Sequence, residues 1–349
     1  MRIEKKKLSQ KKPTKKSNLA TLSLSNGEQN HASTGSARSK QVKFMSKKID
    51  CKKVFGVACD FEVKGFAEKS EFVPTIDENY IFDPKTTLAI LAGFAFNARV
   101  LIQGMHGTGK STHIEQVAAR LNWPCLRINF DSQITRLDLV GKDVIKLKND
   151  KQVTEFKEGI IPFVLRRGVA LVLDEYDAIK TDVSFVIQRL LEEEGKFALL
   201  EENEIITPNQ HFRLFATSNT LGAGDDLGIY HGTNLINQAQ MDRWNIVAAL
   251  NYLDEKHELE ILLKKLPFLN SKPHQQTAKM MVRMGNLTRE AFKNGDISTL
   301  ISLRTLISWG RNIEIFGSVK TAFTLSFLNK VIDDEKMVVS EFYQRVFGE

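Results

Sequence analysis

Cysteine is scarce in this 349-residue chain, which contains only Cys51, Cys59 and Cys125. An odd count without a CxxC pair favours free thiols in a reducing compartment, so we expect a cytoplasmic protein. Long hydrophobic runs are also missing. The longest, "TLAILAGFAF", has ten residues, whereas a membrane-spanning helix needs roughly 20. No apolar segment follows the first basic residues, so neither a secretory signal nor a membrane span is expected.

Acidic residues are nearly absent from the first 49 positions, which hold 13 Lys or Arg but only Glu4 and Glu28. The remaining residues sum to −4, so the net charge of +7 comes from this tail. Because it has no apolar periodicity, we predict that residues 1–48 are disordered. Three interpretations remain open: an over-extended reading frame with the true start at Met45, a solvated tail that loosely binds polyanions, and an organelle transit peptide. Lysine predominates over arginine in the tail, which favours the first two.

Short apolar runs alternate with amphipathic helical segments from about residue 85 onwards. This alternation predicts an α/β fold with a parallel sheet covered by helices on both faces. Two segments alternate with period two, around Asn149-Asp150 and Glu202-Asn203, and predict β-hairpins inserted into that core. The expected strands cover residues 97–104, 125–130, 169–175, 212–219 and 244–253, and two of the expected helices cover 111–122 and 183–195.

Strand patterns stop after about residue 254, and the rest of the chain predicts a smaller all-helical domain. We expect a tail over 1–48, a family-specific segment over 49–84, an α/β core over 85–253 and the helical domain over 254–349. Within the last, the predicted helices cover residues 255–266, 275–295, 298–317 and 319–334.

The segment "GMHGTGKST" follows a predicted strand and opens a predicted helix, and it satisfies the pattern G-x-x-x-x-G-K-[ST]. Glycines let backbone N–H groups surround phosphates, and the helix N-terminus favours negative charge. We expect Lys110 to reach the terminal phosphates and Ser111 to bind Mg²⁺. The predicted nucleotide-binding residues of this loop are Gly104, Met105, His106, Gly107, Thr108, Gly109, Lys110, Ser111 and Thr112.

Polar residues end two further predicted strands. Asp174 and Glu175 close the run "VALVLDE", and Asn219 closes "FRLFATSN". In an open α/β sheet, ligands bind at the carboxyl edge of the strands. We therefore expect Asp174 to join the nucleotide and Mg²⁺ site and Glu175 to polarise the attacking water. Asn219 needs a polar partner there, and the water or the γ-phosphate would supply one.

Two arginines, Arg243 in "MDRW" and Arg304 in "SLRTLI", follow these elements in the sequence. Phosphoryl transfer depends on positioning and charge stabilisation, and an arginine from a neighbouring protein can contribute about 10³-fold or more. A surface ion pair is the more common fate of an arginine. Only their order behind the phosphate-binding loop and the two strand ends makes these two candidates for catalysis.

In this order, the elements resemble those of the AAA+ ATPases, and the two hairpin insertions resemble those of the MoxR and magnesium-chelatase branch. Between about Phe55 and Arg311 the chain is most similar to the small subunits of aerobic cobaltochelatase, the CobS family. In place of the proline that often precedes the second sensor arginine, this chain has Leu303. The stretches that carry the resemblance are "GTGKSTHIEQVAARLNWPC", "RLDLVGKD", "VTEFKEGI", "LVLDEYDA", "FRLFATSNT", "YHGTNLINQAQMDRW" and "RTLISW".

The resemblance implies a P-loop AAA+ core and roles for individual residues. Asp174 and Glu175 would form the Walker B pair and Asn219 sensor 1. Arg243 would be an arginine finger that acts across a subunit boundary, and Arg304 would be sensor 2.

The resemblance also implies an ATP- and Mg²⁺-dependent hydrolase that acts within a ligase forming nitrogen–metal bonds. Such a motor couples ATP hydrolysis to insertion of Co²⁺ into hydrogenobyrinic acid a,c-diamide in cobalamin biosynthesis. The implied assembly is a homo-oligomeric, hexameric ring with a large subunit, which carries the corrin and the metal, and an adhesion-domain subunit, CobT.

The sequence is also compatible with functions other than that of a chelatase motor. A MoxR-like remodelling ATPase acting with an adhesion-domain partner on another client remains the alternative. A nucleic-acid-binding module ranks last, because the only aromatic residue in the basic tail is Phe44 and stacking needs several. A cobalt site on this chain is also not expected, since no closed ligand spacing surrounds any of His106, His113, His211 and His231.

Overall fold

The computed structural model describes residues 46–131, 133–220 and 236–348. Most of the expected tail, including Met45, lies outside the described residues. Strand β1 begins at Ser46 and pairs antiparallel with β2, so residues 46–48 form part of a two-stranded sheet rather than of a tail. None of the helices in the described ranges is both long and apolar enough to cross a membrane. The N-terminal elements are β1 (Ser46–Ile49), α1 (Cys51–Phe55) and β2 (Val63–Phe66).

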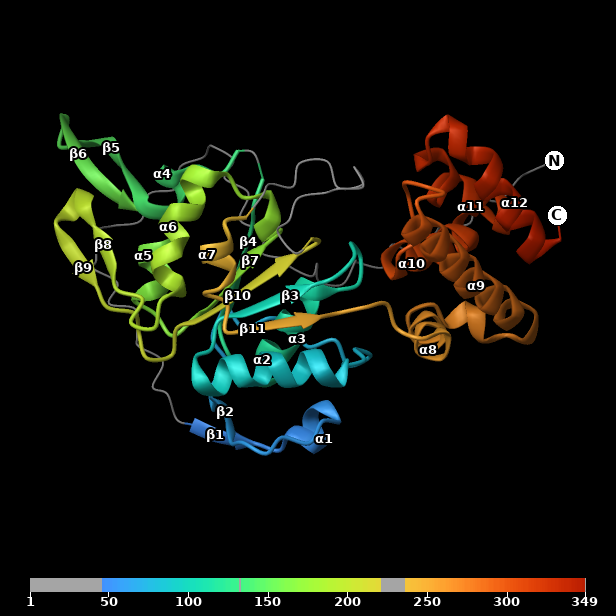
Figure 1. Cartoon of the computed structure of the whole chain (residues 1–349), viewed down its shortest axis with the longest axis horizontal. Coiled ribbons are helices and arrows are strands. Elements are labelled where there is room, and N and C mark those ends of the chain that lie inside the picture. Colours follow the sequence, from blue (N-terminus) through green and yellow to red (C-terminus); the bar gives the residue numbers. More distant parts are fainter. Residues whose placement is uncertain (1–45, 132, 221–235, 349) are drawn as a thin grey trace, which may run out of the picture. The chain divides into compact units, whose positions relative to one another are not determined.

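Five parallel strands form the central sheet in the order β11-β3-β10-β7-β4 (Figure 1). All five predicted strands are present and pair in parallel, which confirms the predicted α/β class. Because β10 lies between β3 and β7, the residues that follow or end these three strands meet at one edge of the sheet. The strands are β3 (Val100–Gln103), β4 (Cys125–Asn129), β7 (Ala170–Asp174), β10 (Arg213–Ser218) and β11 (Ile246–Ala249).

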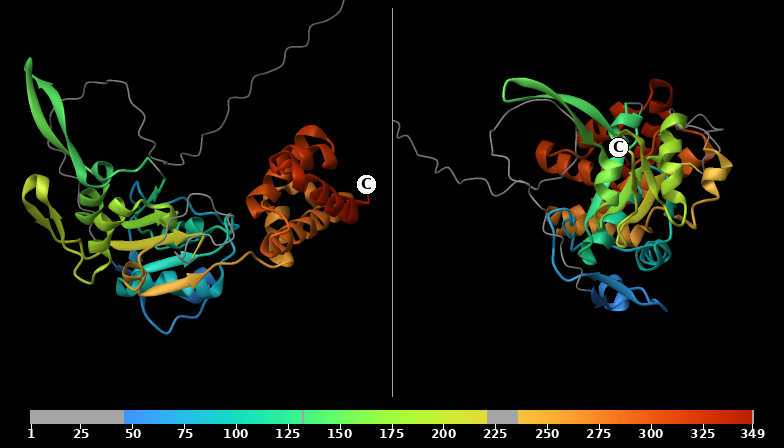
Figure 2. Two further views of the ribbon diagram at one scale, coloured as in Figure 1. Left: turned by 45° about the horizontal axis from the view of Figure 1, so that its top comes forward. Right: turned by 90° about the vertical axis from the view of Figure 1, so that its left-hand side faces the viewer.

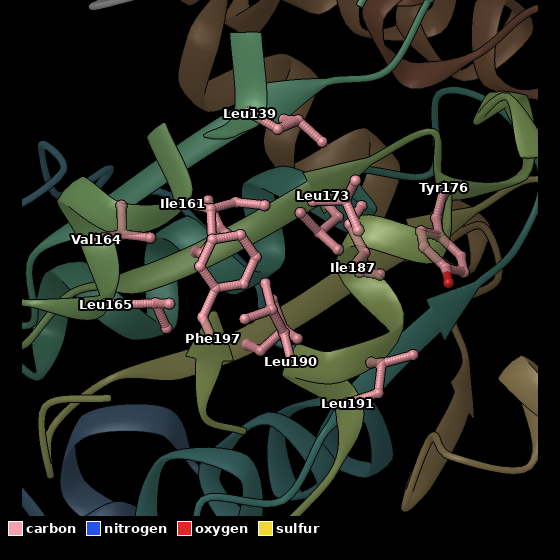
Figure 3. Packing of buried hydrophobic residues seen from close by; sticks show 14 of the residues in the cluster. Leu139, Ile161, Val164, Leu165, Leu173, Tyr176, Ile187, Leu190, Leu191 and Phe197 are labelled. Atoms are coloured by element: carbon pink, nitrogen blue, oxygen red, sulfur yellow. The ribbon is translucent and has the colours of Figure 1, made fainter. Parts of the chain in front are cut away.

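The three central strands, β3, β7 and β10, bury both of their faces, which explains their mostly apolar sequences. Successive side chains of a strand point to opposite faces. Leu171 and Leu173 of β7 pack with α4, α5 and α6, whereas Val172 packs with α2 and α3. Figure 3 shows the first cluster, in which side chains of α5, α6 and β7 converge. These helices are α2 (Pro84–Phe96), α3 (Lys110–Arg120), α4 (Arg136–Val140), α5 (Ile160–Leu165) and α6 (Thr181–Leu191), and a short α7 (Gln238–Met241) precedes β11.

Both predicted hairpins are present and project from the same end of the α/β core (Figures 1 and 2). The turn residues Asn149 and Asp150 have φ of 49° and 58°, the left-handed values that a two-residue hairpin turn requires. Arg166, just after α5, ties the two hairpins together. Its guanidinium donates to Glu158 of one hairpin at 2.8 Å and to both carboxylate oxygens of Glu204 of the other at 2.7 Å. The hairpin strands are β5 (Gly141–Lys148), β6 (Lys151–Glu158), β8 (Phe197–Leu199) and β9 (Glu204–Ile206).

The C-terminal part is helical, as predicted, with its own apolar core around Trp309 and Phe323. Two predicted boundaries are wrong. The helix expected at 298–317 begins at Leu303, because Ser302 accepts a hydrogen bond from the Thr305 amide and caps the helix there. The helix expected at 319–334 ends at Ser326, and the short 3₁₀ turns Leu328–Lys330 and Asp333–Glu335 follow it. The helices are α8 (Glu255–Lys265), α9 (Lys272–Asn294), α10 (Leu303–Phe316), α11 (Val319–Ser326) and α12 (Lys336–Phe347).

Candidate functional site

The loop between β3 and α3 has a backbone that depends on its glycines. Gly107 and Gly109 have φ of 75° and 89°, a region that side chains with a Cβ rarely adopt. A Cβ on Gly104 would lie 2.1 Å from the carbonyl oxygen of Leu250, so only glycine lets the loop approach the end of β11. α3 begins at Lys110, immediately after this loop. The open loop and the first N–H groups of α3 form a cradle of the kind that binds phosphates.

Lys110 occupies the centre of this cradle. Its ammonium donates to the carbonyl oxygens of Gly104 at 2.6 Å and Met105 at 3.0 Å, and to Oδ1 of Asn219 at 2.8 Å. The side chain is 8% exposed, and burial lowers the pKa of the ammonium to about 8 despite the opposing effect of nearby carboxylates, Asp177 first among them. Lys110 therefore joins the loop to the end of β10 and carries a charge that bound phosphates would stabilise.

The remaining residues of the loop hold its shape. The Thr108 hydroxyl donates to the Met105 carbonyl at 2.9 Å, and the Tyr252 hydroxyl donates to the carbonyl of His106. Thr112, one turn into α3, lines the adjacent cavity. The nine residues predicted for nucleotide binding thus form the loop after β3 and the first turn of α3.

Asp174 ends β7 next to the cradle. The Ser111 hydroxyl donates to its Oδ1 at 2.5 Å, and the Thr217 hydroxyl donates to the same oxygen. Because the Ser111 hydroxyl donates its hydrogen bond to Asp174, the lone pairs of the Ser111 oxygen remain available to a cation. Hydroxyl and carboxylate oxygens are the ligands that Mg²⁺ prefers, so the donor set fits that ion.

Glu175 follows Asp174 in a left-handed backbone conformation, with φ 57° and ψ 46°. Its amide donates to the Thr217 hydroxyl at 3.3 Å, which holds this turn against β10, and its side chain is exposed. Although the residue as a whole is exposed, partial desolvation of its carboxyl group raises its pKa, and the carboxylates of Asp174 and Asp177 raise it further. A carboxylate with a raised pKa beside a phosphate cradle is suited to accept a proton from water.

Arg127 was not predicted from the sequence. It lies on β4, with its guanidinium 3.7 Å from Oδ2 of Asp174 and 3.5 Å from Oε1 of Glu115 on α3. This arginine places a positive charge beside the carboxylate that Ser111 contacts. An arginine that alternates with apolar residues in "CLRIN" has no distinguishing signal in a single sequence.

A cavity of about 280 Å³ adjoins the cradle. One wall comes from the N-terminal segment, including Tyr80 and Ile81, and another from α10, including Arg304. The Tyr80 hydroxyl lies 3.1 Å from Nδ1 of His113, and Thr87 contacts the other ring nitrogen at 2.8 Å. Burial lowers the pKa of His113 to about 4, so its ring is neutral at physiological pH and fixes Tyr80 by hydrogen bonding. No pattern in the sequence distinguishes Tyr80 as a residue of this cavity.

The two candidate arginines have different environments. Arg304 lies in the first turn of α10 and lines the cavity. The helix begins at Leu303, so it forms without the proline that often precedes this arginine. Arg243 does not line the cavity of its own chain. Its guanidinium donates to the carbonyl of Ala239 in α7, directly before β11. The structure thus brings Arg304, but not Arg243, to the cradle of the same chain.

Three of the four histidines considered as cobalt ligands lie within the described residues. Within the described parts of the chain, no group of three or more His, Cys, Asp or Glu side chains could hold a metal ion. His106 packs against Phe292, and His211 packs against Phe66. His231 lies outside the described residues.

Three family models match consecutive parts of the chain. They are the cobaltochelatase CobS subunit N terminus over residues 47–73, the AAA domain of the dynein-related subfamily over 99–266, and the CbbQ/NirQ/NorQ C-terminal model over 268–340. The second supports the nucleotide-binding fold that the sheet order and the phosphate cradle indicate.

Curated relatives agree with these models, and solved structures superpose on part of the chain. The aerobic cobaltochelatase subunit CobS of Sinorhizobium sp is 54% identical over 300 residues, which cover 86% of this chain and 90% of the relative. Protein CbbQ of Hydrogenophilus thermoluteolus is 26% identical over 128 residues, or 37% of this chain and 46% of the relative. The RuvB Holliday junction branch migration motor of Thermotoga maritima superposes with a TM-score of 0.43 and 16% identity over 72% of this chain and 69% of that chain.

Proposed function

This chain belongs to the family of aerobic cobaltochelatase CobS subunits, and we propose that it is the ATPase motor of such a chelatase. In this proposal it couples ATP hydrolysis to insertion of Co²⁺ into hydrogenobyrinic acid a,c-diamide in the cytoplasm. The observation that carries the proposal is the 54% identity to a CobS subunit along 86% of the chain. The reaction as a whole would be that of a ligase forming nitrogen–metal bonds.

The cradle and its neighbours supply the hydrolytic step. Lys110 neutralises charge on the terminal phosphates, and Ser111 and Asp174 would hold Mg²⁺, which stabilises negative charge on phosphate oxygens when bound. Glu175 polarises the attacking water and accepts its proton. Asn219, held to Lys110 at 2.8 Å, orients that water relative to the γ-phosphate.

The two arginines complete the site from different directions. Arg304 contributes positive charge from α10 of the same chain. Arg243 does not line its own cavity, so we assign it to the nucleotide of the next subunit in a homo-oligomeric, hexameric ring. The proposed partners are the large chelatase subunit and the adhesion-domain subunit CobT, and the metal and corrin are bound there rather than on this chain.

Reconstitution tests this function. The chain is combined with the large subunit and the adhesion-domain subunit from the same organism, and corrin-bound cobalt is followed by absorbance. We expect insertion only with ATP and the wild-type chain, and none with the matched variant Lys110→Ala. Insertion of cobalt at the same rate without this chain would refute the proposal.

The match to the CbbQ/NirQ/NorQ C-terminal model over residues 268–340 favours a second candidate. In it, the chain is a MoxR-like remodelling ATPase with an adhesion-domain partner and another client. A pull-down from the native host, with a slowly hydrolysed ATP analogue present, distinguishes the two. Recovery of the large chelatase subunit supports the first function, and its absence beside a recovered adhesion-domain protein supports the second.

A further inference from the structure

A second buried carboxylate lies two residues after Glu175. Asp177 belongs to the 3₁₀ turn Tyr176–Ala178 and is 0% exposed. Transfer of an ionised carboxylate into the interior is strongly unfavourable unless hydrogen bonds and nearby charges compensate for the lost water. A buried carboxylate at this position therefore requires partners, and these partners indicate its role.

Among the described residues, the hydrogen bonds to Asp177 come from the two residues that follow β10. Its Oδ2 accepts from the backbone amide of Asn219 at 3.0 Å, from that of Thr220 at 2.9 Å and from the Thr220 hydroxyl at 3.1 Å. Two consecutive amides that point at one oxygen fix the orientation of both peptide planes. Hydrogen bonds to an ionised acceptor are also roughly twice as strong as neutral ones.

The side chain of the residue anchored in this way faces the cradle. Oδ1 of Asn219 accepts from the Lys110 ammonium at 2.8 Å. Asp177, Asn219 and Lys110 thus form a continuous series from the turn after Glu175 to the phosphate-binding loop. Without the hydrogen bonds to Asp177, the backbone of Asn219 would be free to rotate, and its backbone N–H would lose its fixed direction.

We propose that Asp177 is a positioning residue for nucleotide hydrolysis, which acts through Asn219 by fixing its backbone beside Lys110. The effect on turnover rests on the proposed ATPase function, whereas the anchoring of the Asn219 and Thr220 amides does not. The Asp177 carboxylate favours the charged form of Lys110, but the hydrogen bonds of that ammonium with Gly104 and Met105 do not involve Asp177. Loss of the anchor is therefore expected to impair turnover more than nucleotide binding.

A double-mutant cycle in the full-length chain tests the proposal. Steady-state ATP hydrolysis is measured for Asp177→Ala, Asn219→Ala and the double variant, with exposed Asp143→Ala as the control. We expect Asp177→Ala to lower kcat about tenfold or more and to change KM less than about threefold. Residues that act as one unit lose activity non-additively, so the double variant should be as slow as the slower single variant. Asp177→Asn, which keeps an acceptor oxygen, should recover most of the activity.

Amide hydrogen exchange provides a readout that needs no hydrolysis. In Asp177→Ala the amides of Asn219 and Thr220 should exchange at least about tenfold faster, while protection elsewhere in the sheet stays unchanged. If that variant fails to fold, Asp177→Ser is measured instead, because its shorter side chain moves the acceptor oxygen away from the two amides but keeps a polar group.

Three results would overturn the assignment: multiplicative losses in the cycle, unchanged kcat in Asp177→Ala, or unchanged protection of the two amides. A wild-type chain that hydrolyses no ATP would instead refute the proposed function, and amide exchange would still decide whether Asp177 is the anchor.

Discussion

The phenol ring of Tyr176 packs edge-on against the indole of Trp244, with ring centroids 5.3 Å apart. Tyr176 follows Glu175, the proposed water-polarising residue, and Trp244 follows Arg243, the arginine proposed for the next subunit. Both rings are buried. One aromatic contact therefore connects the turn that serves a chain's own nucleotide with the segment that serves its neighbour's.

Truncation of this contact is predicted to affect both stability and turnover. Trp244→Ala removes a buried indole and should lower the free energy of unfolding by about 3–5 kcal/mol, as is typical of large-to-small changes in a core. It should also slow ATP hydrolysis in the assembled protein, because Arg243 loses its support. Trp244→Phe keeps a packed ring and is the control. Urea denaturation and ATPase rates check both effects, and equal rates in the two variants would contradict the coupling.

Nucleotide binding is predicted to take up protons near pH 8. Burial lowers the pKa of Lys110 to about 8, so part of the free protein carries a neutral amine at that pH. Bound phosphates favour the charged form and raise the pKa again, so ATP binding should take up a fraction of a proton at pH 8 and weaken as the pH rises further. Calorimetry in buffers with different ionisation enthalpies measures the uptake. Lys110→Ala should bind no ATP, whereas exposed Lys151→Ala should behave as wild type.

Glu175→Gln is predicted to bind ATP with unchanged affinity and to lose at least about a hundredfold in turnover. An amide cannot accept the proton of the attacking water, and a positioned general base contributes about 10²–10⁴-fold. In the wild type, kcat/KM should fall as the pH falls through the pKa of Glu175 in the free protein, which partial burial raises above its usual 4.5. The acidic limb of the kcat/KM profile should therefore lie above pH 4.5. A wild-type rate in the variant would assign the base to another residue.

Arg243→Ala is predicted to bind ATP normally and to lose most of its turnover. In wild type, specific activity should rise with protein concentration, because the arginine comes from a neighbour. Mixing Arg243→Ala with Lys110→Ala should restore part of the activity, since some boundaries then join an intact arginine to an intact cradle. Absence of rescue at every ratio, in rings shown to contain both variants, would place the function of Arg243 within its own chain.

Local sequence patterns predicted the strands, the hairpins and the cradle because each depends on neighbouring residues. The φ values of Gly107 and Gly109 and the turn at Asn149-Asp150 are examples. The predicted start of α10 was wrong, because the apolar pattern begins before Ser302. The helix begins only after Ser302, since a single capping hydrogen bond there sets the boundary.

Contacts between distant segments were not predicted. Tyr80 meets His113 across 33 positions, and Asp177 meets Asn219 across 42. Each of these residues is ordinary in its own segment, as is Arg127 beside Asp174. These residues come together only when β4, β7, β10 and the N-terminal segment fold around the cradle. Contacts between such distant segments leave no periodic pattern in a single sequence.

Arg166 connects the two inserted hairpins at a point close to the central sheet. Its guanidinium holds Glu158 and Glu204 at once, so one side chain bridges both hairpins. Arg166 lies four positions before β7, the strand that ends in Asp174. The bridge between the hairpins is therefore separated by a single strand from the carboxylate that Ser111 contacts.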